Sequence, residues 1–363
     1  MSEFETRRRS VANRLAGLKA ELKVDGLLLS SPANIQYLTG FTGSNGLLLL
    51  TATELHFFTD PRYALTAQAN ITGKVHVAKG PLLVEAAKLI TRKHFRRIGF
   101  EPSVMRVDQH EQLGKQLGAR VTLRPTGGIV EELRSIKSPS EILRIRKSVM
   151  INSEAYFRTL KRFKIGLREQ EIAAELDFHM RVLGAEKPAF ETIVAAGPHS
   201  ALPHAHPGPR RVETNELLLI DMGATAEGYT SDMTRVTFTG TPSKKIRDMY
   251  QAVLEAQLAA IGTVKAGATT AKVDGAARKV LREYKLEKEF VHSTGHGLGL
   301  EIHETPRIGR KDKTKLQAGM VITIEPGVYL DGLGGVRIED TVLVTERGCE
   351  VLTPTPKEFV YLG

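Results

Sequence analysis

The strongest constraint on the fold is a pattern that the chain carries twice. In each copy an apolar run rich in Ile, Leu or Val ends in an acid, a turn containing glycine follows, and a second run returns with another acid. The first copy reads LIDMG at 219–223 and SDMT at 231–234, and the second reads TIEPG at 323–327 and IEDT at 338–341. Apolar runs separated by such turns are typical of β-hairpins. Two related hairpins facing each other would collect four carboxylates in one pocket, those of Asp221, Asp232, Glu325 and Glu339.

The four acids together predict a site for a pair of metal ions. Carboxylates at close quarters do not all stay ionised unless cations lie among them, because like charges raise one another's pKa. Any single Asp or Glu is more often a solvated residue at a turn or strand end. The matched places of these four acids in two copies outweigh that simpler interpretation.

A fifth ligand candidate lies in a histidine-rich stretch. Residues 291–303 carry three of the eleven histidines, and His296 stands between Gly295 and Gly297, where missing side chains let an imidazole approach an ion. As a phosphate-binding loop these glycines fit poorly, because they lack the dinucleotide spacing and no Lys-Ser/Thr pair follows. One imidazole among carboxylates, without a thiolate, favours manganese(II), cobalt(II) or zinc(II). The sequence does not choose among these three ions.

These five residues carry a resemblance to a known family. The chain resembles the pita-bread metallopeptidases, the family of methionine aminopeptidase, aminopeptidase P, prolidase and creatinase, over roughly residues 138–363. In that family the ligands of a dinuclear metal site come in the order Asp, Asp, His, Glu, Glu. The positions that match this order are Asp221, Asp232, His296, Glu325 and Glu339.

The proline-specific branch of the family is the more similar one. The segment GPHSALPH at 197–204 matches the place of a substrate-side histidine in aminopeptidase P and prolidase, which is His204 here. His292 and His303, four residues before and seven after His296, match two further pocket histidines of these enzymes. The resemblance implies hydrolysis of the amino-terminal Xaa-Pro bond, with Xaa-Pro aminopeptidase activity placed ahead of Xaa-Pro dipeptidase (prolidase) activity. More distant alternatives are a creatinase-like hydrolase and an inactive binding scaffold.

The resemblance also implies how metals act in this site. Two divalent ions, manganese in the first place and cobalt or zinc as alternatives, would hold a bridging hydroxide and polarise the scissile carbonyl. Asp232 and Glu339 would bridge the ions, Asp221 would hold one of them, and His296 with Glu325 the other. Glu325 would in addition relay the proton of the attacking water.

The other site residues would contact the substrate. The resemblance implies that His292 and His303 donate hydrogen bonds to the substrate carbonyl and the oxyanion, while His204 lines the proline subsite. Arg337 would balance the charge of the site or bind substrate, and Arg307 would meet a substrate carboxylate. Either arginine could instead be a surface residue.

Two domains are expected from the element pattern. Residues 1–130 indicate an α/β domain that resembles the creatinase-type amino-terminal domain, with a helix whose face includes Val11, Leu15, Leu18 and Leu22. Strands are predicted at 24–30, 46–51 and 56–59, and a helix at 83–93. Residues 131–363 would form an α+β catalytic domain, a curved antiparallel sheet covered by helices with an internal pseudo-twofold repeat. Its helices are predicted at roughly 139–163, 168–183, 244–262 and 270–284.

Composition excludes some classes of function. The formal charge is +10, but the cations are dispersed, aromatic residues are 6% of the chain and there is no tryptophan, so no nucleic-acid partner is expected. We expect no membrane segment and a cytoplasmic location. The partners would be small peptides with proline at the second position. As in relatives of the proline-specific branch, we expect a homodimer in which one subunit's amino-terminal domain edges the other's active site.

Overall fold

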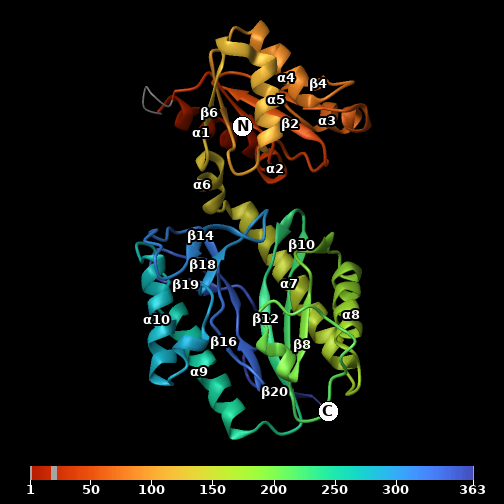
Figure 1. The fold of residues 1–363 in the computed structure, drawn as a ribbon, viewed down its shortest axis with the longest axis vertical. Coiled ribbons are helices and arrows are strands. Elements are labelled where there is room, and N and C mark those ends of the chain that lie inside the picture. The colour runs from red at the N-terminus through yellow and green to blue at the C-terminus, as the bar shows by residue number, and fades with distance from the viewer. Residues whose placement is uncertain (1, 18–22, 363) are drawn as a thin grey trace. The chain divides into compact units, whose positions relative to one another are not determined.

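The computed structural model describes residues 2–17 and 23–362, whose contacts divide the chain into two compact units, Met1–Arg134 and Ser135–Gly363 (Figure 1). Helix α6 (Ile129–Ser135) runs up to this division. The sequence predicted a boundary near residue 130, slightly before it. Among the described residues, no helix combines the length and apolar content that crossing a bilayer requires.

The amino-terminal unit is built on a mixed sheet with the strand order β4-β3-β2-β1-β5-β6. Strands β1, β2 and β3 pair antiparallel, whereas β5 and β6 continue from β1, and β4 from β3, in parallel. The three predicted strands are confirmed as β1 to β3, and the predicted helix at 83–93 is α4. The strands are β1 (Gly26–Leu29), β2 (Gly46–Thr51), β3 (Leu55–Thr59), β4 (Lys74–Val77), β5 (Arg97–Phe100) and β6 (Thr122–Pro125).

Helices cover this sheet through apolar faces. Val11 and Leu15 of the predicted opening helix are buried in α1, while Leu18 and Leu22 lie outside the described residues. Ile90 of α4 and Leu113 of α5 pack against the sheet in one apolar cluster. The helices are α1 (Glu3–Ala16), α2 (Pro32–Thr39), α3 (Ala64–Asn70), α4 (Leu82–Arg92) and α5 (Val107–Leu117).

Four long helices of the second unit lie where the sequence predicted them. They are α7 (Pro139–Arg162), α8 (Glu169–Val182), α9 (Lys244–Ile261) and α10 (Thr270–Glu283). The start of α7 follows from a capping box, because the Ser138 hydroxyl accepts from the backbone N–H of Glu141 and the Glu141 carboxylate accepts from that of Ser138. Pro139 occupies the first turn, where its missing N–H costs nothing.

The strands of the second unit are mainly antiparallel and form several short sheets. One sheet has the order β20-β12-β9-β8 and another the order β14-β13-β15-β18-β19, with β20 (Val360–Leu362) and β19 (Cys349–Val351) at their edges. A small sheet in the order β11-β10-β7, with β7 at Lys187–Pro188, and the pair of β16 with β17 accompany them. The strands near the candidate site are β8 (Ile193–Ala196), β9 (Leu217–Met222), β10 (Ala224–Ala226), β11 (Tyr229–Thr230), β12 (Met233–Thr239), β13 (Gly295–Gly297), β14 (Glu304–Ile308), β15 (Val321–Ile324), β16 (Gly327–Leu330), β17 (Gly334–Arg337) and β18 (Asp340–Val344).

The duplicated pattern folds as two antiparallel strand pairs. In the first copy β9 pairs with β12, so that Asp221 lies opposite Thr234, and in the second β15 pairs with β18, so that Thr323 lies opposite Thr341. The sequence predicted a simple turn between the two runs of each copy. A small strand pair stands there instead, β10–β11 in the first copy and β16–β17 in the second.

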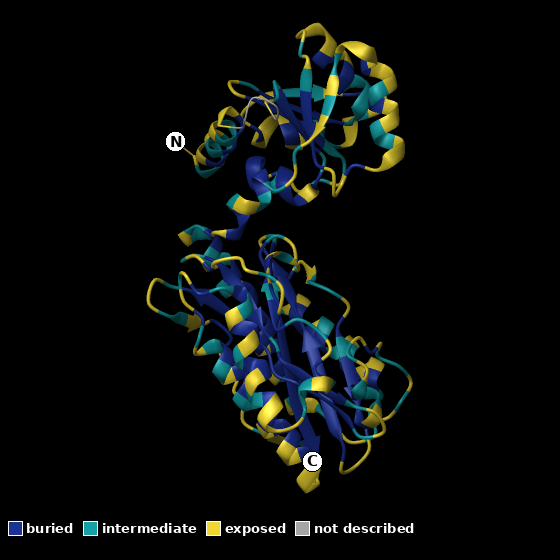
Figure 2. Ribbon diagram, turned by 60° about the vertical axis from the view of Figure 1, so that its left-hand side comes forward, coloured by how far each residue is buried: buried dark blue, intermediate teal, exposed yellow. Residues whose placement is uncertain are grey.

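Two helices accompany each strand pair, and α9 also packs against the first copy. In Figure 1 α7 and α8 accompany the green strands of the first copy, and α9 and α10 the blue strands of the second. The central strands are buried, whereas the outer helix faces are exposed (Figure 2). Alternate residues of β9 enter different apolar clusters, Leu218 and Ile220 with α7 and α8, and Leu219 with α9. Burial on both faces fixes the register of β9, since a slip by one residue would exchange its two faces.

Candidate metal centre

Strand alternation aims the acids of the first copy away from α7 and α8. Because Ile220 and Met222 pack in the cluster with α7 and α8, Asp221 between them points to the opposite face of β9. Asp232 directly precedes β12, the antiparallel partner of β9. Both carboxylates are buried, with 8% and 6% of their surface exposed. The first copy therefore delivers two buried acids from neighbouring strands.

The second copy delivers two acids and an imidazole. Glu325 directly follows β15 and Glu339 directly precedes β18, which pairs with β15. His296 lies in β13, whose Gly297 pairs with Ile322 of β15. A side chain at Gly295 or Gly297 would collide with backbone atoms of the neighbouring strands, because a Cβ would come within 2.0 Å of Thr323 O and within 2.4 Å of Thr305 O. The flanking glycines therefore let β13 approach its neighbours closely.

Side chains of the two copies approach one another closely. His296 Nε2 lies 3.5 Å from Asp232 Oδ2 and 3.3 Å from Glu325 Oε1. Among the described residues, one ligand atom each of Asp232, His296 and Glu339 fall within 4.8 Å of one another. His296 Nδ1 lies 3.0 Å from the carbonyl of Gly297, which it reaches as a donor, so Nε2 keeps its lone pair toward the acids.

Burial shifts the pKa of four groups in this cluster, and neighbouring carboxylates add to the shift at Asp232 and Glu339. Burial and the neighbouring carboxylates, Glu339 foremost, raise the pKa of Asp232 well above its ordinary range. Burial together with Glu325 and Asp221 does the same to the pKa of Glu339, and burial raises the pKa of Glu325 to about 7. Burial lowers the pKa of His296, which favours the neutral imidazole. Such a cluster is unfavourable without a compensating cation.

The donor set fits divalent metal ions. Within the described part of the chain, the buried atoms Asp221 Oδ1 and Glu339 Oε1 accept no hydrogen bond. Unpaired buried carboxylate oxygens are rare and call for a partner. Carboxylates with one neutral imidazole suit manganese, cobalt or zinc. The residues present can therefore hold the metals that the sequence pattern predicted.

Arg337 supplies positive charge to the cluster. It lies in β17 with 3% of its surface exposed, so the alternative of a surface arginine is wrong. Its Nη2 is 2.5 Å from Asp221 Oδ2, Nη1 donates to the Tyr329 hydroxyl at 2.6 Å, and Nε donates to the Thr234 hydroxyl at 3.1 Å. Because these partners engage its donors, the arrangement favours charge balance over direct contact with substrate.

A second buried ion pair, Arg235 with Asp340, joins the two copies next to the cluster. Arg235 follows Thr234 on β12, and its Nη2 lies 2.7 Å from Oδ1 of Asp340, the residue after Glu339. The same guanidinium donates to the carbonyl of Glu339 at 2.5 Å. Lys357 Nζ and Gln257 Nε2 donate to the other Asp340 oxygen at 2.6 Å and 2.8 Å. The backbone next to the ligand candidate Glu339 is thus held by a hydrogen-bonded polar network, which restricts its movement.

The cluster opens into a cavity of about 670 Å³. The cavity is lined by the five ligand candidates together with His204, His292, His303, Arg307 and Arg337, so every residue that the sequence singled out reaches it. His204 and His303 are exposed to it, and the His303 ring stands edge-on to the His296 ring with centroids 4.4 Å apart. Their imidazoles are therefore available to a substrate in the cavity.

His292 differs from the other two histidines because both of its ring nitrogens have protein partners. Nδ1 lies 2.8 Å from the carbonyl of Ser293 and Nε2 2.9 Å from the hydroxyl of Tyr329. Burial lowers the pKa of His292 to about 4, so the ring is neutral, with Nδ1 the donor and Nε2 accepting from Tyr329. A hydrogen bond from His292 to substrate, as the sequence predicted, would require this arrangement to change.

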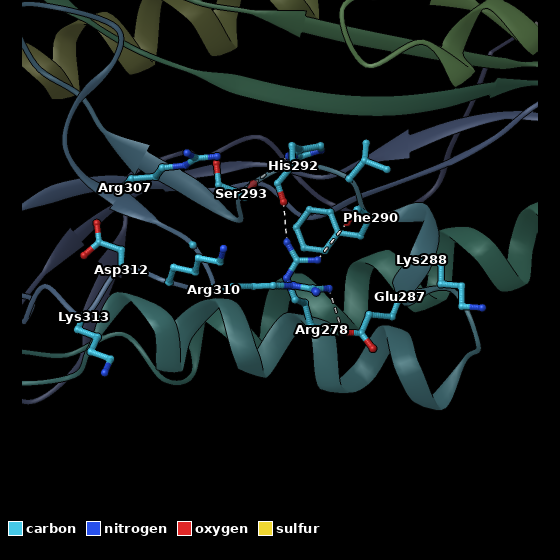
Figure 3. Close-up of a pocket in the computed structure, with 13 residues that line it drawn as sticks. Arg278, Glu287, Lys288, Phe290, His292, Ser293, Arg307, Arg310, Asp312 and Lys313 are labelled. Carbon is cyan, nitrogen blue, oxygen red and sulfur yellow. Dashed lines mark hydrogen bonds and ion pairs between the residues drawn. The ribbon is translucent and has the colours of Figure 1, made fainter.

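A second, more open depression of about 1040 Å³ adjoins the cavity (Figure 3). The two share His292, Ser293 and Arg307, and Figure 3 shows Arg307 beside Ser293. Arg307 lies exposed on β14. The depression is basic, since it is lined by Arg278, Lys288, Arg307, Arg310, Lys311 and Lys313 against the acids Glu287 and Asp312.

Several residues of the site were not anticipated from the sequence. Tyr329 connects His292 to Arg337, and the hydroxyls of Thr234 and Thr323 donate to Glu339 at 2.7 Å and Glu325 at 3.0 Å. The two threonines lie within the duplicated motifs, two residues from a ligand candidate, and this position was a usable signal. Tyr329 lies in the β16–β17 strand pair between the two runs of the second copy, and no sequence pattern indicated its role.

Models of known families match both units. The model of metallopeptidase family M24 matches residues 144–346, and that of the creatinase/prolidase N-terminal domain matches residues 12–136.

Similar proteins span nearly the whole chain. An Xaa-Pro dipeptidase of Pyrococcus furiosus is 37% identical over 96% of this chain and 98% of its own length. The solved structure of an Xaa-Pro dipeptidase from Bacillus anthracis is 37% identical with a TM-score of 0.94, covering 98% of this chain and 100% of that one. The structure of an X-Pro aminopeptidase from Thermotoga maritima is 34% identical with a TM-score of 0.88, covering 97% and 99%.

Proposed function

Because this chain belongs to metallopeptidase family M24, we propose that it is an Xaa-Pro dipeptidase, which hydrolyses dipeptides with proline in the second position. The observation that carries the proposal is the similarity, over nearly the full length of both chains, to proteins described as Xaa-Pro dipeptidases. This reverses the order given by the sequence alone, which placed aminopeptidase activity ahead of dipeptidase activity. An Xaa-Pro bond is a tertiary amide without an N–H, so a dedicated enzyme for it is chemically reasonable.

The proposed site holds two divalent ions, with manganese the first candidate and cobalt or zinc the alternatives. Asp221, Asp232, His296, Glu325 and Glu339 would hold these ions, and one ligand atom each of Asp232, His296 and Glu339 already lie within 4.8 Å of one another. When bound, the ions supply Lewis-acid activation of the scissile carbonyl and of the attacking water. The unpaired buried oxygens of Asp221 and Glu339, and the Nε2 lone pair of His296, support this assignment.

The chain's own groups would position the substrate and move the proton. Glu325, which lines the cavity and lies 3.3 Å from His296 Nε2, would take the proton of the attacking water. His303, beside His296, would donate to the developing oxyanion. His204, which lines the same cavity, would contact the proline ring.

Arg307 would bind the carboxylate of a dipeptide substrate. Its support is its place between the catalytic cavity and the basic depression, and a guanidinium binds a carboxylate with two parallel hydrogen bonds. In an Xaa-Pro dipeptide the proline itself carries the free carboxylate. Binding of that carboxylate by Arg307 would therefore favour dipeptides over longer peptides.

Hydrolysis of Ala-Pro and of Ala-Pro-Ala-Ala, each after loading with manganese(II) and with cobalt(II), tests the proposal. Cleavage of the dipeptide alone is the expected result. Cleavage of the longer peptide would point to the second candidate, an Xaa-Pro aminopeptidase, which the similarity to the Thermotoga maritima structure favours. Inertness toward both peptides would end the proline-specific proposal.

Metal analysis distinguishes a metal-dependent dipeptidase from a creatinase-like hydrolase or a binding scaffold. A stoichiometry near two transition ions per chain after reconstitution is expected for the dipeptidase. Less than about one ion per chain would favour the alternatives, because family members of these kinds lack the ligand set.

The active form is proposed to be a homodimer, on the strength of the resemblance to the proline-specific branch. Light scattering of the full-length protein at micromolar concentration should then give twice the 39.9 kDa mass of one chain. A monomer under these conditions would contradict the proposal.

A further inference from the structure

A buried ion pair on α10 lies behind the segment that carries His292. Asp274 is fully buried, Arg278 is 6% exposed, and Arg278 Nε lies 2.7 Å from Asp274 Oδ2 one helical turn away. Neither residue lines the catalytic cavity. Such a pair is costly to desolvate, so its hydrogen bonds to other groups decide what it does.

Arg278 grips the backbone on both sides of an exposed residue. Nη1 donates to the carbonyl of Phe290 at 3.0 Å and Nη2 to the carbonyl of His292 at 2.6 Å (Figure 3). Val291 between them is 69% exposed. The guanidinium also lies 4.1 Å from the centre of the Phe290 ring. The two carbonyls lie outside the strands, so the arginine replaces the ladder hydrogen bonds that a strand would supply.

The contacts of the pair continue into the site. The Phe290 ring stands edge-on to the His292 ring, with centroids 5.0 Å apart and planes at 88°. Asp274 Oδ1 accepts from the Thr294 hydroxyl at 2.9 Å, and the Thr294 carbonyl accepts from the backbone N–H of Glu325 at 2.7 Å. The pair thus fixes Phe290, His292 and Thr294, alternate residues of the segment that leads into β13.

We propose that Asp274 and Arg278 are positioning residues, which hold the 290–294 segment so that the His292 ring keeps the place in the active site that turnover requires. The inference rests on the proposed function and adds His292 to it, because the His292 ring accepts from Tyr329, whose hydroxyl accepts from Arg337, the partner of Asp221. The segment needs such support because it forms the wall between the cavity and the basic depression and is therefore open to solvent on one side. Only a guanidinium can donate to both carbonyls and to Asp274 at once, since its donors form a rigid fork.

Two substitutions separate this role from general stability. R278M keeps an apolar stem but removes every donor, and R278K keeps the charge beside Asp274 but cannot span both carbonyls. The matched control is R282M, one turn further along α10, where an exposed arginine pairs with Glu287. With the metal-loaded enzyme and Ala-Pro, R278M should lower kcat by about 10- to 100-fold with little change in KM or metal content, the usual cost of losing a supporting contact. R278K should fall between R278M and the wild type, and R282M should match the wild type.

Hydrogen exchange provides a readout independent of catalysis. Backbone amides of 290–294 should exchange faster in R278M and R278K than in the wild type and R282M, whether or not the substrate assignment is right. Unchanged exchange in this segment would overturn the positioning role. Should R278M not fold, R278K still decides the question, because it retains the ion pair.

A double-mutant cycle tests whether the effect passes through His292. H292A should lower kcat, and R278M should cause little further loss in the H292A background, because the group that it positions is absent. Independent losses that multiply, or a silent H292A, would overturn the inference. A wild type that does not cleave Ala-Pro would instead refute the proposed function, and the exchange experiment would still report on the Arg278 contacts.

Discussion

The two copies of the acidic motif are alike in their strands and differ in what connects them. Each copy has a threonine two residues after its second acid, and each threonine reaches across to the other copy. Thr234 donates to the Glu339 carboxylate at 2.7 Å, whereas Thr341 donates to the backbone carbonyl of Asp232 at 3.0 Å. The repeat therefore explains how the two strand pairs face each other and why four acids converge.

The inserted strand pairs explain the asymmetry of the site. Tyr229 in the first copy donates to Glu141 of α7, far from the ligands in sequence, whereas Tyr329 in the second contacts His292 and Arg337. Arg337 in turn holds Asp221 of the first copy. The duplicated motif thus supplies the four carboxylates. The β16–β17 pair of the second copy supplies Arg337, which neutralises part of their charge. One guanidinium does not balance four carboxylates, so the difference must come from metal ions or protons.

Removing one acid from either copy should abolish both metal binding and turnover. For Asp232→Asn in the first copy or Glu339→Gln in the second, we expect a loss well beyond the roughly 10- to 100-fold usual for residues that only support a ligand. Metal analysis and Ala-Pro hydrolysis measure this, with the exposed Glu227→Gln on the β10–β11 turn as control. If one of the two variants kept both ions and full activity, the two copies would not be equivalent partners in the site.

Loss of His303, which lies outside the duplicated motif, should lower turnover without affecting metal binding. His303→Ala should retain the metals and lower kcat by about 10²- to 10³-fold, the usual cost of a lost oxyanion donor. His206→Ala is the matched control, because His206 is exposed in the same cavity and lies 3.3 Å from Glu191. A fully active His303→Ala enzyme would remove His303 from the mechanism.

Arg307 should affect substrate binding more than the chemical step. Arg307→Leu should raise KM for Ala-Pro by about tenfold or more, as expected for a lost charge-assisted hydrogen bond, with a smaller change in kcat. The same substitution at Arg310, which lines the depression but not the cavity, is the control. Equal effects of the two substitutions would indicate general attraction by the basic surface rather than a specific contact.

The sequence predicted the parts of the molecule that local patterns determine. The cap formed by Ser138 and Glu141 placed the start of α7, and the repeated acid motif identified residues that the fold does bring together. Resemblance to the metallopeptidase family, confirmed by the matching family model, extended this to the architecture.

The sequence did not predict hydrogen bonds that depend on tertiary packing. The link from Tyr329 to His292 joins residues 37 positions apart, and the bonds of Arg278 depend on how α10 packs against the 290–294 segment. No spacing in the chain signals either contact. The motifs also did not determine the order of the two proline-specific activities, because the resemblance attaches the same acids and histidines to aminopeptidases and dipeptidases alike.

The smallest effect should appear in the stability of the metal-free protein. The folded state raises the pKa of Asp232, Glu325 and Glu339 above their ordinary values, so these three groups hold more protons in the folded state than in the unfolded chain. The stability that these groups contribute is fully present below about pH 4 and is lost as pH rises through the raised values, about 7 for Glu325. Burial lowers the pKa of His292 and His296, whose contribution rises with pH up to the ordinary histidine value of about 6.5. Above that value the carboxyl groups dominate, and we expect the Tm of the metal-free protein to fall between pH 6.5 and pH 8 by about 2–4 °C, the shift that corresponds to roughly 1 kcal/mol. Manganese should cancel the decline, since the ions replace the protons, and Glu325→Gln should flatten it without metal. A metal-free Tm that rises over this range, with the same slope in Glu325→Gln, would contradict the destabilising effect assigned to the acids of both copies.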